Sequence, residues 1–485
     1  MNDKIIISID SEIQRFQKFL LLEENKKIIF SAPFGNGKTY FLNNFFDGNG
    51  EYQPFFIYPV HYVVSSNDDI FEYIKFDVIF KLLEIIDESE KIDFSNNLLL
   101  PFFIQNNINE LISLVAEFSG KIGKALKLLP QILKLNKSFE EYKERVQKTD
   151  YDILLDYLHT QKNKNGSIYE SNLITELLDS LIDDWKNKAE NTNKKTVLII
   201  DDLDRLDPEH IFRIFNIFAA HSDYYQQNEI KYGFDKIMLV CDINNVRKIF
   251  HSKYGLDVDF AGYIDKFYDR DIFFFDNHLL VEESVDRIFK SIRFDSTYND
   301  ILNFRDDLYT CSSALKFLIK LCIKNNLINL RSLLKYSNKP YSIKDYMIPI
   351  NWKSYNYNTA FAPFIVLDLM SDLMGTDKDL KLKIEILGNK LISEYFNDEI
   401  LEKIIRTFIA LADYSKNRFR IYNMDPSYEY TILDSTIIIR YRLTKELLAF
   451  VDFKSENILE YAHDITRNIL NEACSNYLKI KSGIY

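Results

Sequence analysis

The 485-residue sequence predicts an α/β protein, with a parallel sheet in its N-terminal part followed by a mostly α-helical C-terminal region. The first observation is that short apolar segments, at 27–31, 197–200 and 236–242, alternate with segments of helical spacing. The second is that the segment VLII is apolar throughout, as expected of a strand covered on both faces of a parallel sheet.

The elements of the sheet part are expected in a regular order. The predicted helices cover residues 10–24, 39–46, 68–87 and 173–188, and the predicted strands cover residues 27–31, 54–64, 197–200, 236–242 and 271–275. Pro33 and the following glycines end the first strand, DGNG ends the second helix, and ENTNKK ends the fourth. After residue 281 helical spacing dominates, with one strand-like stretch at 430–443.

Residues 98–159 interrupt this alternation. Their apolar residues follow three-to-four spacing, but Lys and Glu occur throughout. This pattern predicts an amphipathic helical insert of about 90–165 that packs on protein and does not span a lipid bilayer.

Composition excludes several classes of protein. Hydrophobic residues make up 47% of the chain and charged residues 27%, which is a globular balance. With 60 basic and 72 acidic residues, the net charge of −12 argues against general nucleic-acid binding and leaves only a local basic patch for it. Four cysteines without a CxxC pair, no signal-peptide pattern and no run of 18 apolar residues predict a cytoplasmic protein with no membrane span.

The turn SAPFGNGKTY lies between the first predicted strand and the second predicted helix. It follows the phosphate-binding pattern G-x-x-x-x-G-K-[ST], except that Ala32 replaces the first glycine. In that pattern backbone N–H groups surround the phosphates, Lys38 reaches the β- and γ-phosphates, and Thr39 gives its hydroxyl to Mg²⁺. The nucleotide-binding residues predicted here are Ala32, Pro33, Phe34, Gly35, Asn36, Gly37, Lys38, Thr39 and Tyr40. Taken alone, the turn could equally be structural.

A second motif, VLIIDDLDRLDP, supports the nucleotide interpretation. Asp201 directly follows an apolar strand, where nucleotide hydrolases place the carboxylate that holds Mg²⁺. Asp202 either orients or deprotonates the attacking water, or is a salt-bridged surface acid. Asp204 and Arg205 either pair with each other or line the site. The alternative for the whole motif is a charged loop that caps the helix beginning at Pro208.

These motifs resemble the KAP family of P-loop NTPases over about residues 1–340. The segments APFGNGKTYFL, VLIIDDLDRLDPEHIFRIFNIF, IMLVCDINNV and YIDKFYDRDIFFF are each similar to that family's motifs. The sequence departs from the family pattern at Ala32, at Tyr40 and in YPVHYVV, and Phe34 takes the place of a tryptophan. The resemblance implies an ATPase that uses ATP and Mg²⁺ and couples nucleotide state to assembly or signalling, in bacteria often within anti-phage defence.

Four further residues follow from this comparison. Asp242 ends a strand and either senses the γ-phosphate through water or caps a helix. Lys266 and Arg270 precede the last strand and either reach a neighbouring subunit's nucleotide, as catalytic cations, or are solvated charges. Arg331 resembles the family's lid arginine, with a helix-surface arginine as the alternative.

The resulting expectation is a P-loop core over 1–280, a helical lid over 281–345 and a helical sensor or partner-binding domain over 346–485. The core is expected to form a homo-oligomer, and an effector or trigger protein of unknown identity is expected as a partner. The predicted function is an ATP-hydrolysing switch. The alternative is a nucleotide-loaded scaffold with hardly any turnover, because Asp202 is shorter than the glutamate that many related ATPases use. A small-molecule kinase is disfavoured, since no acceptor-binding motif is evident.

Overall fold

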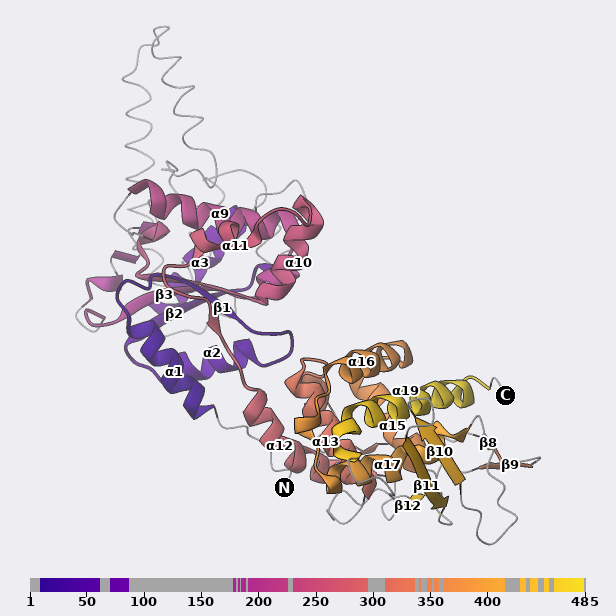
Figure 1. Ribbon diagram of the computed structural model, residues 1–485. Helices are drawn as coiled ribbons and strands as arrows, with labels where there is room; N and C mark the ends of the chain where they lie inside the picture. Colours follow the sequence, from indigo (N-terminus) through magenta and orange to yellow (C-terminus); the bar gives the residue numbers. More distant parts are fainter. Residues whose placement is uncertain are drawn as a thin grey trace, which may run out of the picture. The chain divides into compact units, whose positions relative to one another are not determined.

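The computed structural model describes two compact units of the chain. The described residues are 9–61, 70–86, 178–179, 182–183, 185–188, 191–225, 230–294, 310–335, 340–341, 347–350, 353–356, 362–414, 428–432, 437–443, 449–452 and 458–483. One unit comprises Asp10–Pro33 and Lys38–Phe275, and the other comprises Asp276–Tyr485 together with the short loop Phe34–Gly37 (Figure 1). Each unit is considered by itself below.

The first unit is built on the predicted parallel sheet. Its strands are β1 (Lys27–Ser31), β2 (Tyr52–Ile57), β3 (Lys195–Ile200), β4 (Lys236–Cys241) and β5 (Phe273–Phe274), in the spatial order β2-β3-β4-β1-β5. The pairs between neighbouring strands are all parallel. Strands β1 and β4 are buried at every position, which confirms the prediction of a sheet covered on both faces.

Helices cover both faces of this sheet (Figure 1). The described helices are α1 (Asp10–Leu21), α2 (Lys38–Asp47), α3 (Ile70–Ile86), α9 (Pro208–Tyr225), α10 (Ile243–Tyr254) and α11 (Phe260–Ile264). On the α1–α2 face, the ring of Phe16 packs against Phe30 of β1 and Phe41 of α2, with centroid distances of 5.4 and 5.6 Å. On the other face, Ile29 joins a cluster of buried side chains from α3, α9, α10 and α11. Adjacent residues of β1 therefore serve opposite layers, as strand geometry requires.

Two expectations for this unit differ from the structure or lie outside it. The strand expected over 54–64 ends at Ile57, and Pro59–His61 forms a 3₁₀ turn, η1. Its partner β3 also ends there, with Ile57 beside Ile200, and Pro59 has no N–H to continue a ladder. The helical insert of about 90–165 falls on residues 87–177, which lie outside the described residues.

The second unit is mostly helical, as expected, and contains small sheets. Its described helices are α12 (His278–Ser291), α13 (Thr310–Lys324), α14 (Leu330–Leu334), α15 (Ala362–Met374), α16 (Asp377–Lys390), α17 (Asp398–Ala412) and α19 (Ala462–Lys481). Its strands are β6 (Arg293–Phe294), β7 (Pro340–Tyr341), β8 (Met347–Ile350), β9 (Lys353–Asn356), β10 (Tyr428–Ile432), β11 (Ile437–Leu443) and β12 (Ala449–Asp452). The strand-like stretch 430–443 is therefore two antiparallel strands, β10 and β11.

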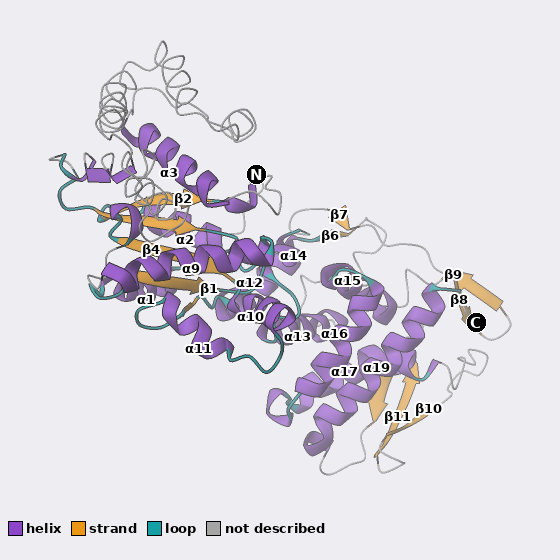
Figure 2. Ribbon diagram, turned by 90° about the horizontal axis from the view of Figure 1, so that it is seen from above, coloured by secondary structure: helices purple, strands orange, loops and turns teal. Residues whose placement is uncertain are grey.

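One cluster of buried side chains extends through this unit, from Val281 to Ile480. The sheet β10-β11-β12 packs on helices, and Figure 2 shows β10 and β11 beside α17 and α19. The hydroxyl of Tyr441 on β11 donates a 2.7 Å hydrogen bond to Asp413, which follows α17. Residues expected in the lid and residues expected in the C-terminal domain thus share one core, and their division at 345 remains a prediction.

A buried polar network joins the ends of helices in this unit. The Asp368 carboxylate of α15 accepts hydrogen bonds from the hydroxyl of Tyr477, at 2.7 Å, and from Nζ of Lys481, at 3.0 Å. Lys481 also donates to Asp377, at 2.8 Å. Only 3% of Asp368 is exposed, so these donors compensate a carboxylate that has lost its water.

Within the part of the chain that the structure describes, none of the helices combines the length and the apolar character needed to cross a bilayer.

Candidate nucleotide-binding site

The glycine-rich turn joins β1 to α2 at the carboxyl end of the sheet. Gly35 and Gly37 have φ of 78° and 86°, in the left-handed region where a side chain is disfavoured. Ala32 is buried, and its N–H donates to the Cys241 carbonyl at the end of β4, at 3.2 Å. The chain therefore still follows the sheet at position 32, and a methyl group is accommodated where the usual pattern has glycine.

Lys38 is the first residue of α2 and is buried. Its ammonium group donates a 2.9 Å hydrogen bond to the carbonyl of Ala32, at the other end of the same turn. The lysine is therefore held back over the loop at the N-terminus of a helix, where an anion is favoured.

Thr39 and Asp201 meet at this edge of the sheet. The Thr39 hydroxyl donates a 2.6 Å hydrogen bond to Oδ2 of Asp201, and the Asp202 N–H donates to Oδ1 at 2.7 Å. None of Asp201 is exposed to solvent, and burial raises the pKa of its carboxyl group, while these two donors lower it. The structure thus brings together the two residues predicted to hold a metal.

This donor set fits Mg²⁺. A threonine hydroxyl and a carboxylate are hard oxygen ligands, and Mg²⁺ in nucleotide sites is held by one or two such groups plus phosphates and water. A desolvated carboxylate with a raised pKa is also a group that a cation would stabilise.

Asp202 adopts the salt-bridged geometry. Its backbone lies in the left-handed region, with φ 57° and ψ 32°, and its Oδ2 accepts a 2.7 Å hydrogen bond from Nη1 of Arg205. Arg205 therefore pairs with Asp202, which lies on the same side of the short helix η2 (Leu203–Arg205). The two alternatives for Asp204 and Arg205, that they pair with each other or line the site, remain predictions. A role for Asp202 on water remains a prediction.

Asp204 lies on the buried side of η2. It is 9% exposed, and burial raises the pKa of its carboxyl group while the Lys38 charge lowers it. Asn245 of α10 donates to Oδ2 at 3.4 Å. Asp204 is therefore within reach of the Lys38 charge, and its place in the lining of the site remains a prediction.

Asp242 has the geometry of a helix cap. Its Oδ1 accepts a 3.0 Å hydrogen bond from the N–H of Asn244 at the start of α10. Of the two alternatives for Asp242, the structure shows the helix-capping contact. A role in sensing the γ-phosphate remains a prediction.

The tip of the turn, Phe34–Gly37, belongs to the same unit as residues from Asp276 onward. Within that unit the Arg331 N–H donates to the Gly35 carbonyl at 3.2 Å, whereas the Arg331 side chain is exposed. Buried Asn277 donates from Nδ2 to the Asn36 carbonyl at 2.6 Å. Asn277 was not among the predicted residues, and the available signal was its position three residues after β5, directly before α12.

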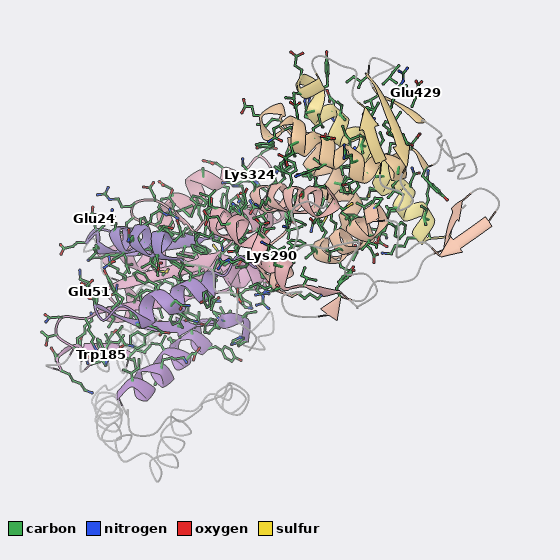
Figure 3. All side chains as sticks on the ribbon, turned by 90° about the horizontal axis from the view of Figure 1, so that it is seen from below. Glu24, Glu51, Trp185, Lys290, Lys324 and Glu429 are labelled. Carbon is green, nitrogen blue, oxygen red and sulfur yellow. The ribbon has the colours of Figure 1, made fainter. Side chains whose placement is uncertain are left out.

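Lys266 and Arg270 lie at the other end of the sheet. Arg270 forms an ion pair with Glu24, which is labelled in Figure 3 and lies three residues before the start of β1. Lys266 is exposed, and its backbone carbonyl accepts a 3.3 Å hydrogen bond from Nζ of Lys27. Within their own chain these two cations are not brought to Lys38, so a role at a neighbouring subunit's nucleotide remains a prediction.

Tyr58 is a site residue that sequence reasoning missed. It directly follows β2, the neighbour of β3, and is half-buried. Burial raises the pKa of its hydroxyl to about 12, with a further contribution from the Asp201 charge. The hydroxyl therefore stays protonated near the Asp201 carboxylate, and finding it required knowing that β2 pairs with β3.

The comparison with protein families agrees with this geometry. The model of the KAP family P-loop domain matches residues 10–302, which is more than half of the chain. No curated protein and no solved structure matches the chain. The parallel sheet, the turn that precedes α2 and the family match together show a nucleotide-binding NTPase fold, and the chain belongs to the KAP family of P-loop NTPases.

Proposed function

We propose that this protein binds ATP with Mg²⁺ and hydrolyses it, and that the nucleotide state acts as a switch for assembly or signalling. The observation that carries the proposal is the 2.6 Å hydrogen bond between Thr39 and Asp201, which joins the phosphate-binding turn to the strand-end carboxylate. Asp201 is buried and Thr39 is half-buried, at the end of the sheet where parallel α/β folds bind ligands.

Each residue has a distinct part in this proposal. Backbone N–H groups of the turn surround the phosphates, and Lys38 leaves the Ala32 carbonyl to place its charge on the β- and γ-phosphates. The Thr39 hydroxyl and the Asp201 carboxylate hold Mg²⁺, which neutralises charge on the transferred phosphoryl group. Burial of Lys38 and Asp201 strengthens these interactions, because water screens them less than at a surface.

A second function, a nucleotide-loaded scaffold, is favoured by one observation. Asp202 is paired with Arg205 and is therefore not free to act on water in this geometry. A protein of this kind would bind ATP tightly and recruit an effector with hardly any turnover.

Phosphate release at saturating ATP and Mg²⁺ distinguishes the two functions. The switch predicts steady turnover that stops when EDTA removes the metal, whereas the scaffold predicts ATP that stays intact on the protein. GTP in place of ATP tests the choice of base. Co-purified ATP recovered unhydrolysed after hours at 25 °C would favour the scaffold.

The proposed setting is the bacterial cytoplasm, in anti-phage defence, with self-association through the NTPase core. The proposed role in defence rests on membership of the KAP family, since resemblance to that family implies such a role. The proposed location rests on the acidic, globular composition of the chain. Phage plating on cells with and without the gene tests it, with the Lys38→Ala variant as the matched control.

A further inference from the structure

Three carboxylates lie within the four positions that follow β3, and they differ in which hydrogen-bond donors they already have. Asp201 accepts from Thr39 and from a backbone N–H, and Asp202 accepts from Arg205. One oxygen of Asp204 accepts from Asn245, and the other, Oδ1, is buried and has no partner at good hydrogen-bond geometry, although the backbone N–H groups of Asp204 and Asp242 act on the carboxylate.

We propose that Asp204, and not Asp202, is the carboxylate that accepts a hydrogen bond from the water that attacks ATP. This inference rests on the proposed hydrolysis and assigns its catalytic carboxylate. It departs from the expectation that the acid directly after the metal-holding aspartate does this.

Asp202 is turned away from the role by its backbone. The left-handed conformation at φ 57° is held by the N–H donated to Asp201, and in this geometry the side chain meets Arg205. The Arg205 side chain is 46% exposed, so this ion pair lies on the solvent side of the turn. An exposed ion pair of this kind adds little to stability, but it shows that the Asp202 carboxylate points toward Arg205.

Asp204 has the opposite character. The buried Oδ1 has lost its hydration, and within the described residues no donor at good hydrogen-bond geometry replaces it, so the carboxylate has room for a further donor. An attacking water supplies such a donor. Asn245 holds the other oxygen from α10 and so fixes the direction of the carboxylate.

The strand order places this carboxylate opposite the phosphate-binding lysine. Strand β4 lies between β3 and β1, so Asp204 follows one neighbour of β4 and Lys38 follows the other. The Lys38 charge and the backbone N–H of Asp242, at the end of β4, both act on Asp204. The Lys38 charge and the Asp204 carboxylate therefore face each other across the end of β4, where the γ-phosphate would bind.

The reaction balances with these groups alone. The water oxygen forms a bond to the terminal phosphorus, and the bond from that phosphorus to the bridging oxygen breaks, with its electron pair staying on ADP. One water proton passes to Asp204 and returns from there to solvent. Positioning and proton acceptance of this kind contribute about 10²- to 10⁴-fold.

The test compares Asp204→Asn with Asp202→Asn in the full-length protein. We expect Asp204→Asn to lower kcat by about 100-fold or more, with the Kd for ATP and the Mg²⁺ requirement changed by less than about 3-fold. Asp202→Asn is expected to keep kcat within about 5-fold. A large loss in Asp202→Asn with little in Asp204→Asn would overturn the inference while leaving the proposed ATPase intact.

Further measurements separate catalysis from folding and from metal binding. Asn245→Ala removes the group that orients Asp204 and should lower kcat several-fold at unchanged melting temperature and ATP affinity. A raised Mg²⁺ requirement in Asp204→Asn would make Asp204 a metal holder and overturn the inference. A wild-type protein that binds ATP without turnover would contradict the proposed hydrolysis and, with it, a water-activating Asp204.

Discussion

The hydroxyl of Thr39 lies 2.6 Å from Oδ2 of Asp201, although the two residues are 162 positions apart in the chain. Thr39 is fixed by the first turn of α2, and Asp201 by the end of β3. Helix α2 follows β1, and the carboxyl ends of β1 and β3 lie at one edge of the sheet because both strands pair with β4 and run parallel to it. This contact is the structural basis for the predicted nucleotide chemistry.

The first prediction concerns Lys38. Replacing it with alanine removes the charge that the turn holds over the phosphate site, and the loss of such a charged hydrogen bond should weaken ATP·Mg²⁺ binding by about 100-fold. Calorimetry measures the affinity, and the melting temperature checks the fold. The control is Lys248→Ala, which removes an exposed lysine of α10. Unchanged affinity in Lys38→Ala would place the nucleotide site elsewhere.

The second prediction concerns the pH dependence of stability through Lys236. This buried ammonium donates to the carbonyls of Leu22 and Asn25, and burial lowers its pKa to about 8, from 10.5. Between pH 8 and 10.5 the unfolded chain binds more protons at this residue than the folded one, so its contribution to folding becomes more favourable as pH rises. The cost of burying the charge is fully present below pH 8.

Chemical unfolding of wild type and Lys236→Met from pH 7 to pH 10 measures this effect. The free energy of unfolding of wild type, relative to the variant, should rise above pH 8. Lys248→Met controls for the general titration of exposed lysines. A difference that stays constant over this range would contradict the prediction.

The third prediction concerns the network around Asp368. Tyr477→Phe leaves this buried carboxylate with one donor fewer and should lower the free energy of unfolding by about 1–2 kcal/mol. Nucleotide binding should be unaffected, since the network contains none of the residues proposed to bind the nucleotide. Denaturant unfolding measures the change, with Tyr461→Phe at a more exposed tyrosine as the control. Equal stability of the two variants would show that the Tyr477 hydroxyl contributes nothing.

The fourth prediction concerns catalysis between subunits. Lys266 and Arg270 lie away from Lys38 in their own chain, so a catalytic role would require a neighbour's nucleotide, where a cation raises turnover by roughly 10³-fold in other NTPases. Turnover per protomer should then rise with protein concentration. Arg270→Ala and Lys266→Ala should reduce hydrolysis more than ATP binding.

The matched control is Glu24→Ala, which breaks the ion pair with Arg270 and leaves the cation in place. Adding inactive Lys38→Ala protein to Arg270→Ala should restore turnover, because each supplies the part that the other lacks. Concentration-independent turnover by a strict monomer in light scattering would exclude this mechanism.

Much of the sheet was predictable because its strands carry a strong signal. A strand buried on both faces has a continuous apolar run, and the runs at 28–30 and 197–200 therefore differ clearly from the helices around them. The end of β2 was not predictable, because it depends on which strand lies beside it. The pair β10 and β11 was read as one stretch, since their pairing is a tertiary feature.

The site residues were predictable where their position next to the end of a strand or the start of a helix fixes where they lie. Thr39 and Asp201 are such residues, and the structure brings them together. The directions of the Asp202 and Asp204 side chains were not predictable, because they depend on the left-handed backbone of Asp202, for which the sequence carries no signal. Tyr58 requires the order of strands in space, which sequence alone leaves open.

The dependence of ATP affinity on Mg²⁺ tests the central claim most directly. Calorimetric titrations with ATP, at increasing Mg²⁺, compare the wild type with Thr39→Ala, Asp201→Asn and the exposed control Asp207→Asn. We predict that Mg²⁺ tightens ATP binding to the wild type and to the control, and that this gain is lost in both site variants. Mg²⁺-dependent binding that persists unchanged in Asp201→Asn would contradict the assignment of this site.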